Sequence, residues 1–183
     1  MRRPVLLSVF AVLVMACVHG DSFDNGVLRK GDLVVHLGPL PSSWRRVDVD
    51  GADLAFRDDV HEGSALFDVS CGRRDDDAPL PVLTGHLIMG TTERELETQE
   101  TIPFDGREAM HSLFRAKLDG VPMRYDIYVM KKDGCVYDIV YVAPPDFFAE
   151  GARDFELFAR GAHALSSPRA IGSEQTGSSS SDP

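Results

Sequence analysis

The residues that could carry catalysis or bind a metal are scattered along this chain. No two of the six histidines stand three or four positions apart, so no helix presents a histidine pair to a metal ion. The acidic clusters at 58–59 and 75–77 lack the alternate spacing of a calcium loop, and we interpret them as solvated or helix-capping residues. Gly63-Ser64 does not fit a nucleophile elbow, and the sequence contains neither a P-loop nor a dinucleotide-binding fingerprint.

These absences predict a protein without a cofactor, without a metal site and without enzymatic activity. A hydrolase or a redox protein is kept as a third interpretation, because catalytic sets are recognised by their geometry and not by their order in the chain. The net charge of −10 argues against binding of nucleic acid, since phosphate contacts dominate that affinity and no run of Lys and Arg exceeds two residues.

The first residues have the composition of an export signal. Arg2 and Arg3 are followed by the apolar segment 5–15, which is too short to cross a bilayer as a helix. The ending Val14-Met15-Ala16-Cys17 resembles the lipobox of bacterial lipoproteins. That resemblance implies cleavage before Cys17 and attachment of acyl chains such as palmitate, two or three of which give stable anchoring. The alternatives are an ordinary signal peptide with a chance cysteine, or a strand of the core.

The resemblance to a lipobox and the composition along the chain give the predicted boundaries and location. Residues 1–16 are the signal peptide, 17–30 the lipidated cysteine and a tether, 31–165 one domain, and 166–183 a Ser-rich disordered tail. The domain is expected in the periplasm, within the cell envelope. Val18, directly after Cys17, favours the outer membrane over the inner membrane. The predicted partners are the membrane, reached through the acyl chains, and an envelope protein.

Period-two alternation predicts strands through most of the domain. Alternating or continuous apolar positions occur in the segments 33–37, 44–49, 52–57, 64–71, 110–118, 121–129 and 135–142. Asp-Gly pairs at 50–51, 119–120 and 133–134 indicate hairpins between several of these segments. Helical spacing occurs in two places, among the leucines at 80, 83 and 87 and in a phenylalanine-rich stripe from Phe148 to Leu165. Asp146 is expected to cap the second helix.

Runs of strands with few helices predict an α+β fold, with an antiparallel sheet of about six to seven strands packed by two helices. This order resembles the Mog1/PsbP-like fold, which occurs in several small bacterial lipoproteins. The matching features are Trp44, the turns at 119–120 and 133–134 around the segment 125–129, and the segment 155–158 of the last helix. Because known members mostly bind partners, the resemblance implies an interaction or assembly module.

Two further groups of residues are candidate sites. If Cys17 carries lipid, Cys71 and Cys135 remain as an even pair in an oxidising compartment, and we predict a disulfide between them. Two separate buried thiols are the alternative. A possible face for a partner or a ligand consists of Phe114, Met123, Tyr125, Tyr137 and Tyr141. The predicted function is a membrane-anchored, non-catalytic interaction module, and the alternative is a binder of a small apolar or lipid ligand.

Overall fold

The computed structural model describes residues 21–72 and 77–166, which form two antiparallel sheets and two helices. The large sheet has seven strands in the order β4-β5-β6-β10-β9-β8-β7, and the small sheet has four in the order β1-β2-β3-β11. The strands of the large sheet are β4 (Trp44–Val47), β5 (Leu54–Asp58), β6 (Gly63–Cys71), β7 (Thr92–Phe104), β8 (Arg107–Leu118), β9 (Val121–Lys132) and β10 (Cys135–Ala143). Those of the small sheet are β1 (Ser22–Asp24), β2 (Val27–Lys30), β3 (Leu33–His36) and β11 (His163–Ser166). The helices are α1 (Leu80–Leu87) and α2 (Pro145–Arg160).

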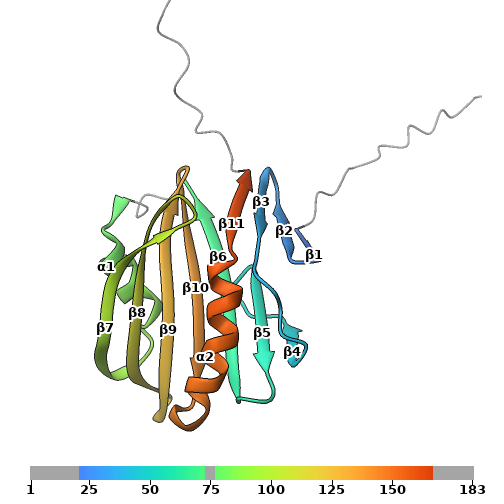
Figure 1. Ribbon diagram of the computed structural model, residues 1–183. Helices are drawn as coiled ribbons and strands as arrows, with labels where there is room; N and C mark the ends of the chain where they lie inside the picture. Colours follow the sequence, from blue (N-terminus) through green and yellow to red (C-terminus); the bar gives the residue numbers. More distant parts are fainter. Residues whose placement is uncertain (1–20, 73–76, 167–183) are drawn as a thin grey trace, which may run out of the picture.

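The two helices pack on opposite faces of the large sheet. Helix α2 contacts β10, β9 and β6, whereas α1 contacts β9 and β8. In the view of Figure 1, α2 crosses the front of the sheet and α1 lies behind it. Each face has its own apolar core, with Phe155 and Phe158 under α2, and with Leu83 and Ile127 under α1. The α+β architecture predicted from the sequence periodicity is confirmed.

Two of the predicted Asp-Gly turns are tight hairpin connections. Asp119-Gly120 joins β8 to β9 and Asp133-Gly134 joins β9 to β10, and all four residues have positive φ. Positive φ at both central positions is the type I′ geometry, whose twist matches that of antiparallel strands. Gly51 also has positive φ, but it lies in the longer connection between β4 and β5. The turn Asp105-Gly106, which the sequence analysis did not single out, joins β7 to β8 in the same way.

The tether predicted over residues 17–30 is too long, because most of its second half is folded. Residues 22–24 and 27–30 are strands β1 and β2 of the small sheet. Leu28 is buried in the core together with Leu33 and Val35 of β3. Burial of this leucine is the physical reason that the segment joins the domain. The predicted tail over 166–183 begins one residue too early, because Ser166 belongs to β11. Residues 17–20 and 167–183 lie outside the described residues.

The last helix begins and ends differently from the prediction. Its N-cap position is occupied by Pro144, while Asp146 lies within the first turn and makes no capping hydrogen bond. The buried stripe Phe148, Gly151, Phe155 and Phe158 is confirmed. The helix ends at Arg160, and Leu165 belongs to β11, where it is exposed. Within the described ranges, neither helix has the length and apolarity needed to span a bilayer.

Candidate functional site

Two histidine–aspartate pairs lie on the face of the large sheet that α2 covers. One consists of Asp58, at the end of β5, and His61, in the turn that leads to β6. The other consists of His111 on β8 and Asp126 on β9. The strand register connects them, because Tyr141, which binds Asp58, is directly opposite Asp126 on the neighbouring strand. Polar groups therefore run across the sheet beneath and beside the helix.

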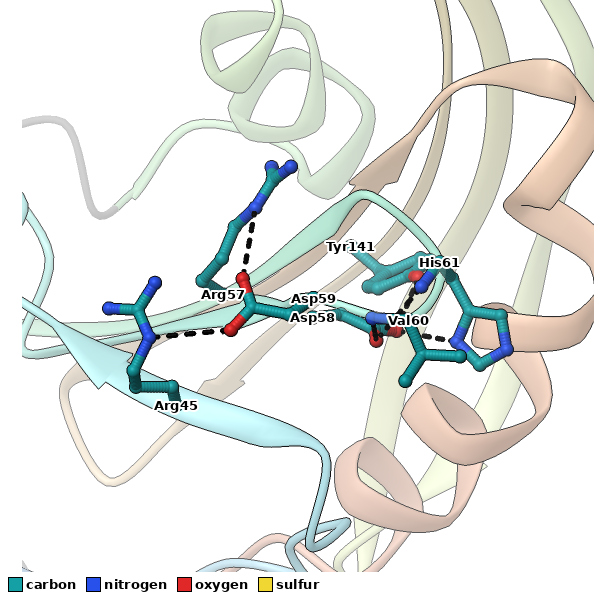
Figure 2. A network of polar contacts seen from close by, with 7 residues as sticks. All are labelled: Arg45, Arg57, Asp58, Asp59, Val60, His61 and Tyr141. Carbon is teal, nitrogen blue, oxygen red and sulfur yellow. Dashed lines mark hydrogen bonds and ion pairs between the residues drawn. The ribbon is translucent and has the colours of Figure 1, made fainter.

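Asp58 has no exposed surface, and its carboxylate accepts four hydrogen bonds. Oδ1 accepts from the backbone N–H groups of Val60 and His61, each at 3.2 Å. Oδ2 accepts from Nδ1 of His61 at 2.8 Å and from the hydroxyl of Tyr141 at 3.0 Å. Figure 2 shows the neighbouring Asp59 pointing the opposite way, toward Arg45 and Arg57 at the surface. The sequence predicted that Asp58 and Asp59 are both solvated or helix-capping residues. Only Asp59 lies at the surface, whereas Asp58 is buried.

The charges of this network follow from its hydrogen bonds. Burial alone would raise the pKa of Asp58, but the hydrogen bonds from His61 and Tyr141 outweigh that effect and hold it below its usual value. Burial and the adjacent Asp58 carboxylate raise the pKa of Tyr141, so its hydroxyl remains a donor. An ionised carboxylate can only accept, so Nδ1 of His61 carries a proton. In neutral His61 the lone pair is then on Nε2.

Two glycines make room for the tyrosine at the centre of the network. A Cβ atom placed at Gly63 of β6 or at Gly151 of α2 would overlap with the Tyr141 hydroxyl. Gly151 allows α2 to approach the sheet closely enough for Phe148 and Phe155 to pack on the Tyr141 ring. The network therefore joins the β5–β6 turn, strand β10 and helix α2 at one point.

The second histidine–aspartate pair lies beneath a surface cleft. Nε2 of His111 lies 2.8 Å from Oδ1 of Asp126, and its Nδ1 lies 3.6 Å from Oε1 of Glu100. The imidazole ring stacks on Tyr128, with 4.2 Å between ring centroids. Burial opposes protonation of His111, but the hydrogen bond and charge of Asp126, aided by Glu100, raise its pKa. Burial raises the pKa of Asp126, and the interaction with His111 acts against this rise.

A cleft of about 190 Å³ opens between α2 and strands β8 and β9. It is lined by His111, Leu113, Asp126, Tyr128, Phe148, Ala149, Ala152, Arg153 and Glu156. The side chains of His111 and Asp126 are 16% and 7% exposed, so they form a largely desolvated polar floor. The walls combine apolar surface from Leu113 and Phe148 with the charges of Arg153 and Glu156. The cleft can therefore accept a group that is apolar along one side and polar at its tip.

Neither pair forms a complete catalytic set. In residues 21–72 and 77–166, no serine, threonine or cysteine side chain is hydrogen-bonded to either imidazole. A nucleophile within hydrogen-bonding reach of its base is the basic requirement of acyl-transfer sites. The described residues also contain no group of three or more acidic, histidine or cysteine side chains placed to hold a metal ion. The geometry provides an oriented imidazole and a polar cleft, without an activated nucleophile.

The predicted disulfide is confirmed. Cys71 of β6 and Cys135 of β10 are directly opposite each other and are bonded, with an S–S distance of 2.05 Å. A hollow of about 470 Å³ lies beside Cys71, next to Lys30 and Leu33. The ammonium group of Lys30 is held by Asp53 and by the carbonyl of Val69, so its charge is already neutralised.

The predicted ligand or partner face is not a single surface. Phe114, Tyr125 and Met123 belong to the core beneath α1, whereas Tyr137 and Tyr141 belong to the core beneath α2. Strands β9 and β10 meet at a two-residue turn that places Tyr125 opposite Val142, so Tyr141 points to the other face. Four of the five residues are buried and Met123 is partly buried. They form the two cores and do not line one shared pocket.

No sequence pattern groups the four residues of the two pairs, which are Asp58, His61, His111 and Asp126. One signal was present for Asp58, because it shares parity with Leu54 and Phe56, which point into the core. A polar residue that continues an apolar face is buried and must find hydrogen-bond partners. The partner Tyr141 is 83 positions away, and no local pattern connects the two residues.

Comparison with known proteins identifies the fold. No protein-family model matches the sequence, and no curated protein matches it significantly. The solution structure of cyanobacterial PsbP (CyanoP) from Synechocystis sp. PCC 6803 is similar, with a TM-score of 0.55 and 18% identity over 80% of this chain and 92% of that chain. LpqN, involved in cell envelope biogenesis of Mycobacterium tuberculosis, has a TM-score of 0.54 and 15% identity over 74% of this chain and 86% of its own. The Saccharomyces cerevisiae Ran-binding protein Mog1p has a TM-score of 0.51 and 12% identity, over 74% and 92%. The domain has a Mog1/PsbP-like fold, as the sequence predicted.

Proposed function

We propose that this chain is a lipid-anchored protein of the bacterial cell envelope and that its domain is a non-catalytic interaction module. The anchor is Cys17, made the first mature residue by cleavage of the signal peptide 1–16. Residues 18–21 connect it to β1, so the domain is held close to the bilayer. Val18 favours the outer membrane, with the domain in the periplasm. LpqN, which shares the fold, is involved in cell envelope biogenesis, and this agrees with the proposed location.

The cleft beside α2 is the observation that carries the proposal of partner binding. Small-molecule sites commonly enclose about 300–1,000 Å³, and this cleft measures about 190 Å³. It is large enough for one or two side chains of a protein that docks on the domain. Its polar floor is already paired internally, through His111 and Asp126, and therefore favours recognition over chemistry. The partner is an envelope protein that inserts a side chain between Leu113 and Phe148.

Site-specific photo-crosslinking in living cells tests this function. Benzoylphenylalanine is introduced at Ala149, an exposed residue of the cleft wall on α2. The matched control carries it at Val49, which is 44% exposed in the connection between β4 and β5. Strand β4 lies at the opposite edge of the large sheet from β7 and β8, so the control position is remote from the cleft.

The expected result is a discrete crosslinked envelope protein from Ala149 and none from Val49. The additional substitution Ala152→Arg, which fills the cleft, should abolish the crosslink while the protein remains folded by circular dichroism. Equal crosslinking from both positions, or a crosslink that survives Ala152→Arg, would show that the cleft is not the docking surface.

A further inference from the structure

The imidazole of His61 is oriented as metal-binding histidines are. Histidine ligands commonly donate one ring N–H to a carboxylate, which fixes the tautomer and leaves the other nitrogen for the metal. Here Nδ1 of His61 donates to the buried carboxylate of Asp58 at 2.8 Å. That carboxylate is fixed in turn by two backbone N–H groups and by Tyr141. The orientation of the ring is therefore set before any ligand arrives.

The free nitrogen of His61 faces a second ligand atom. Nε2 lies 3.9 Å from Oε2 of Glu150, on the first half of α2. Two ligands of one tetrahedral zinc ion, at bond lengths near 2.0–2.1 Å, stand roughly 3.3 Å apart. Glu150 is 75% exposed and free to rotate, so a small movement of its carboxylate closes the remaining gap. The side chain of His61 is 14% exposed, so the ring is not completely closed off from solvent.

We propose that His61 and Glu150 bind a divalent first-row transition-metal ion such as Zn²⁺, with Asp58 as the carboxylate that orients the histidine. Imidazole nitrogen with carboxylate oxygen is a donor set suited to this class of ion. Water or a group from a partner completes the coordination, because the described part of the chain contributes two ligands. The ion would join the β5–β6 turn to α2, on the side of the His61 ring that points away from Asp58 (Figure 2).

Isothermal titration of the purified, chelator-treated protein with Zn²⁺ tests the site. The wild type should show one saturable Zn²⁺-binding event at His61 and Glu150, and His61→Gln should abolish this binding. Because an outer-shell change alone typically weakens metal affinity by about 10–100-fold, loss of a direct ligand in Glu150→Gln should weaken binding by at least tenfold. Glu150 is exposed, so this variant retains the fold and keeps the test decisive if His61→Gln does not fold.

Two matched variants separate this site from other zinc binding. Glu156→Gln removes an exposed carboxylate from the same helix that is paired with Arg160, and it should leave the affinity unchanged. His163→Gln breaks the stacked His36–His163 pair in the small sheet, and it should also leave this event intact. The proposal is wrong if the wild type binds no Zn²⁺ up to millimolar concentration. It is equally wrong if Glu150→Gln binds as tightly as the wild type, or if His163→Gln removes the event.

Discussion

The hydroxyl of Tyr141 donates a 3.0 Å hydrogen bond to the carboxylate of Asp58, which stands 83 positions earlier in the chain. Both side chains are fully buried, and the same carboxylate holds His61. One hydrogen bond therefore ties the β5–β6 turn to the centre of the large sheet. Its position directly beneath α2 also fixes how closely the helix can pack.

Replacement of Tyr141 by Phe should destabilise the domain without altering its fold. The change removes a buried hydrogen bond to a charged group, which is worth about 1.5–3 kcal/mol. Urea unfolding of Tyr141→Phe, Asp58→Asn and the double variant measures the coupling between the two residues. The two single effects should sum to clearly more than the effect of the double variant. Strict additivity would mean that the two groups do not act together.

Replacement of Gly151 by Ala should lower the free energy of unfolding by about 1–3 kcal/mol, because the added methyl group overlaps with the Tyr141 hydroxyl. Gly85 of α1 is the matched control, since a Cβ there meets no atom within 4 Å. Gly85→Ala should be neutral or stabilising by about 0.5–1 kcal/mol. Thermal unfolding of both variants distinguishes these outcomes, and equal melting temperatures would contradict the close approach of α2 to Tyr141.

Loss of the disulfide should destabilise the domain strongly. Cys71 and Cys135 are separated by 64 positions, and closing a loop of this length contributes about 4 kcal/mol in the chain-entropy model. The double variant Cys71→Ser/Cys135→Ser should therefore unfold at markedly lower urea than the oxidised wild type. The reduced wild type should match the variant. A wild type whose unfolding midpoint does not respond to reductant would contradict this expectation.

The contact between His111 and Asp126 should make stability depend on pH near neutrality. The pKa of His111 is raised in the folded state, so its contribution is fully present below the pKa of an unfolded histidine, about 6.5. It is lost as pH rises through the folded-state pKa. The stability difference between wild type and His111→Gln should therefore shrink from pH 6 to pH 8.5 in urea titrations. A difference that grows over this range would reverse the assigned direction of the shift.

Much of the fold could be predicted from sequence because the hairpins are local. In β9 and β10, two-residue type I′ turns and period-two alternation specify both the strands and their pairing. The two-residue turn at Asp133-Gly134 also fixes the register of β9 and β10, and this register places Tyr125 and Tyr141 on opposite faces of the sheet. The predicted single ligand face did not take this register into account. Contacts between distant segments are not indicated by any turn or alternation pattern in the sequence. Strand β2 joins the small sheet through the burial of Leu28, and Asp58 meets Tyr141 only after the whole sheet has formed.

The candidate sites show the same difference between features that the sequence indicates and features that depend on contacts between distant segments. The pairing of Cys71 with Cys135 was predicted by counting cysteines in a chain expected to be exported, and the structure confirms the bond. The cleft lies between α2 and the neighbouring strands β8 and β9, and sequence periodicity does not specify where the helix packs on the sheet. His61 and His111 looked isolated in the sequence because their carboxylate partners are recognised only in three dimensions.

The most direct test of the account is the intact mass of the protein extracted from membranes after expression in a bacterium, measured with and without reductant. The expected mass is that of Cys17 onward plus two or three acyl chains, and it should rise by about 2 Da when the Cys71–Cys135 bond is reduced. An unlipidated protein that begins at another residue would contradict the anchor. It would instead make this chain a freely diffusing protein of the envelope.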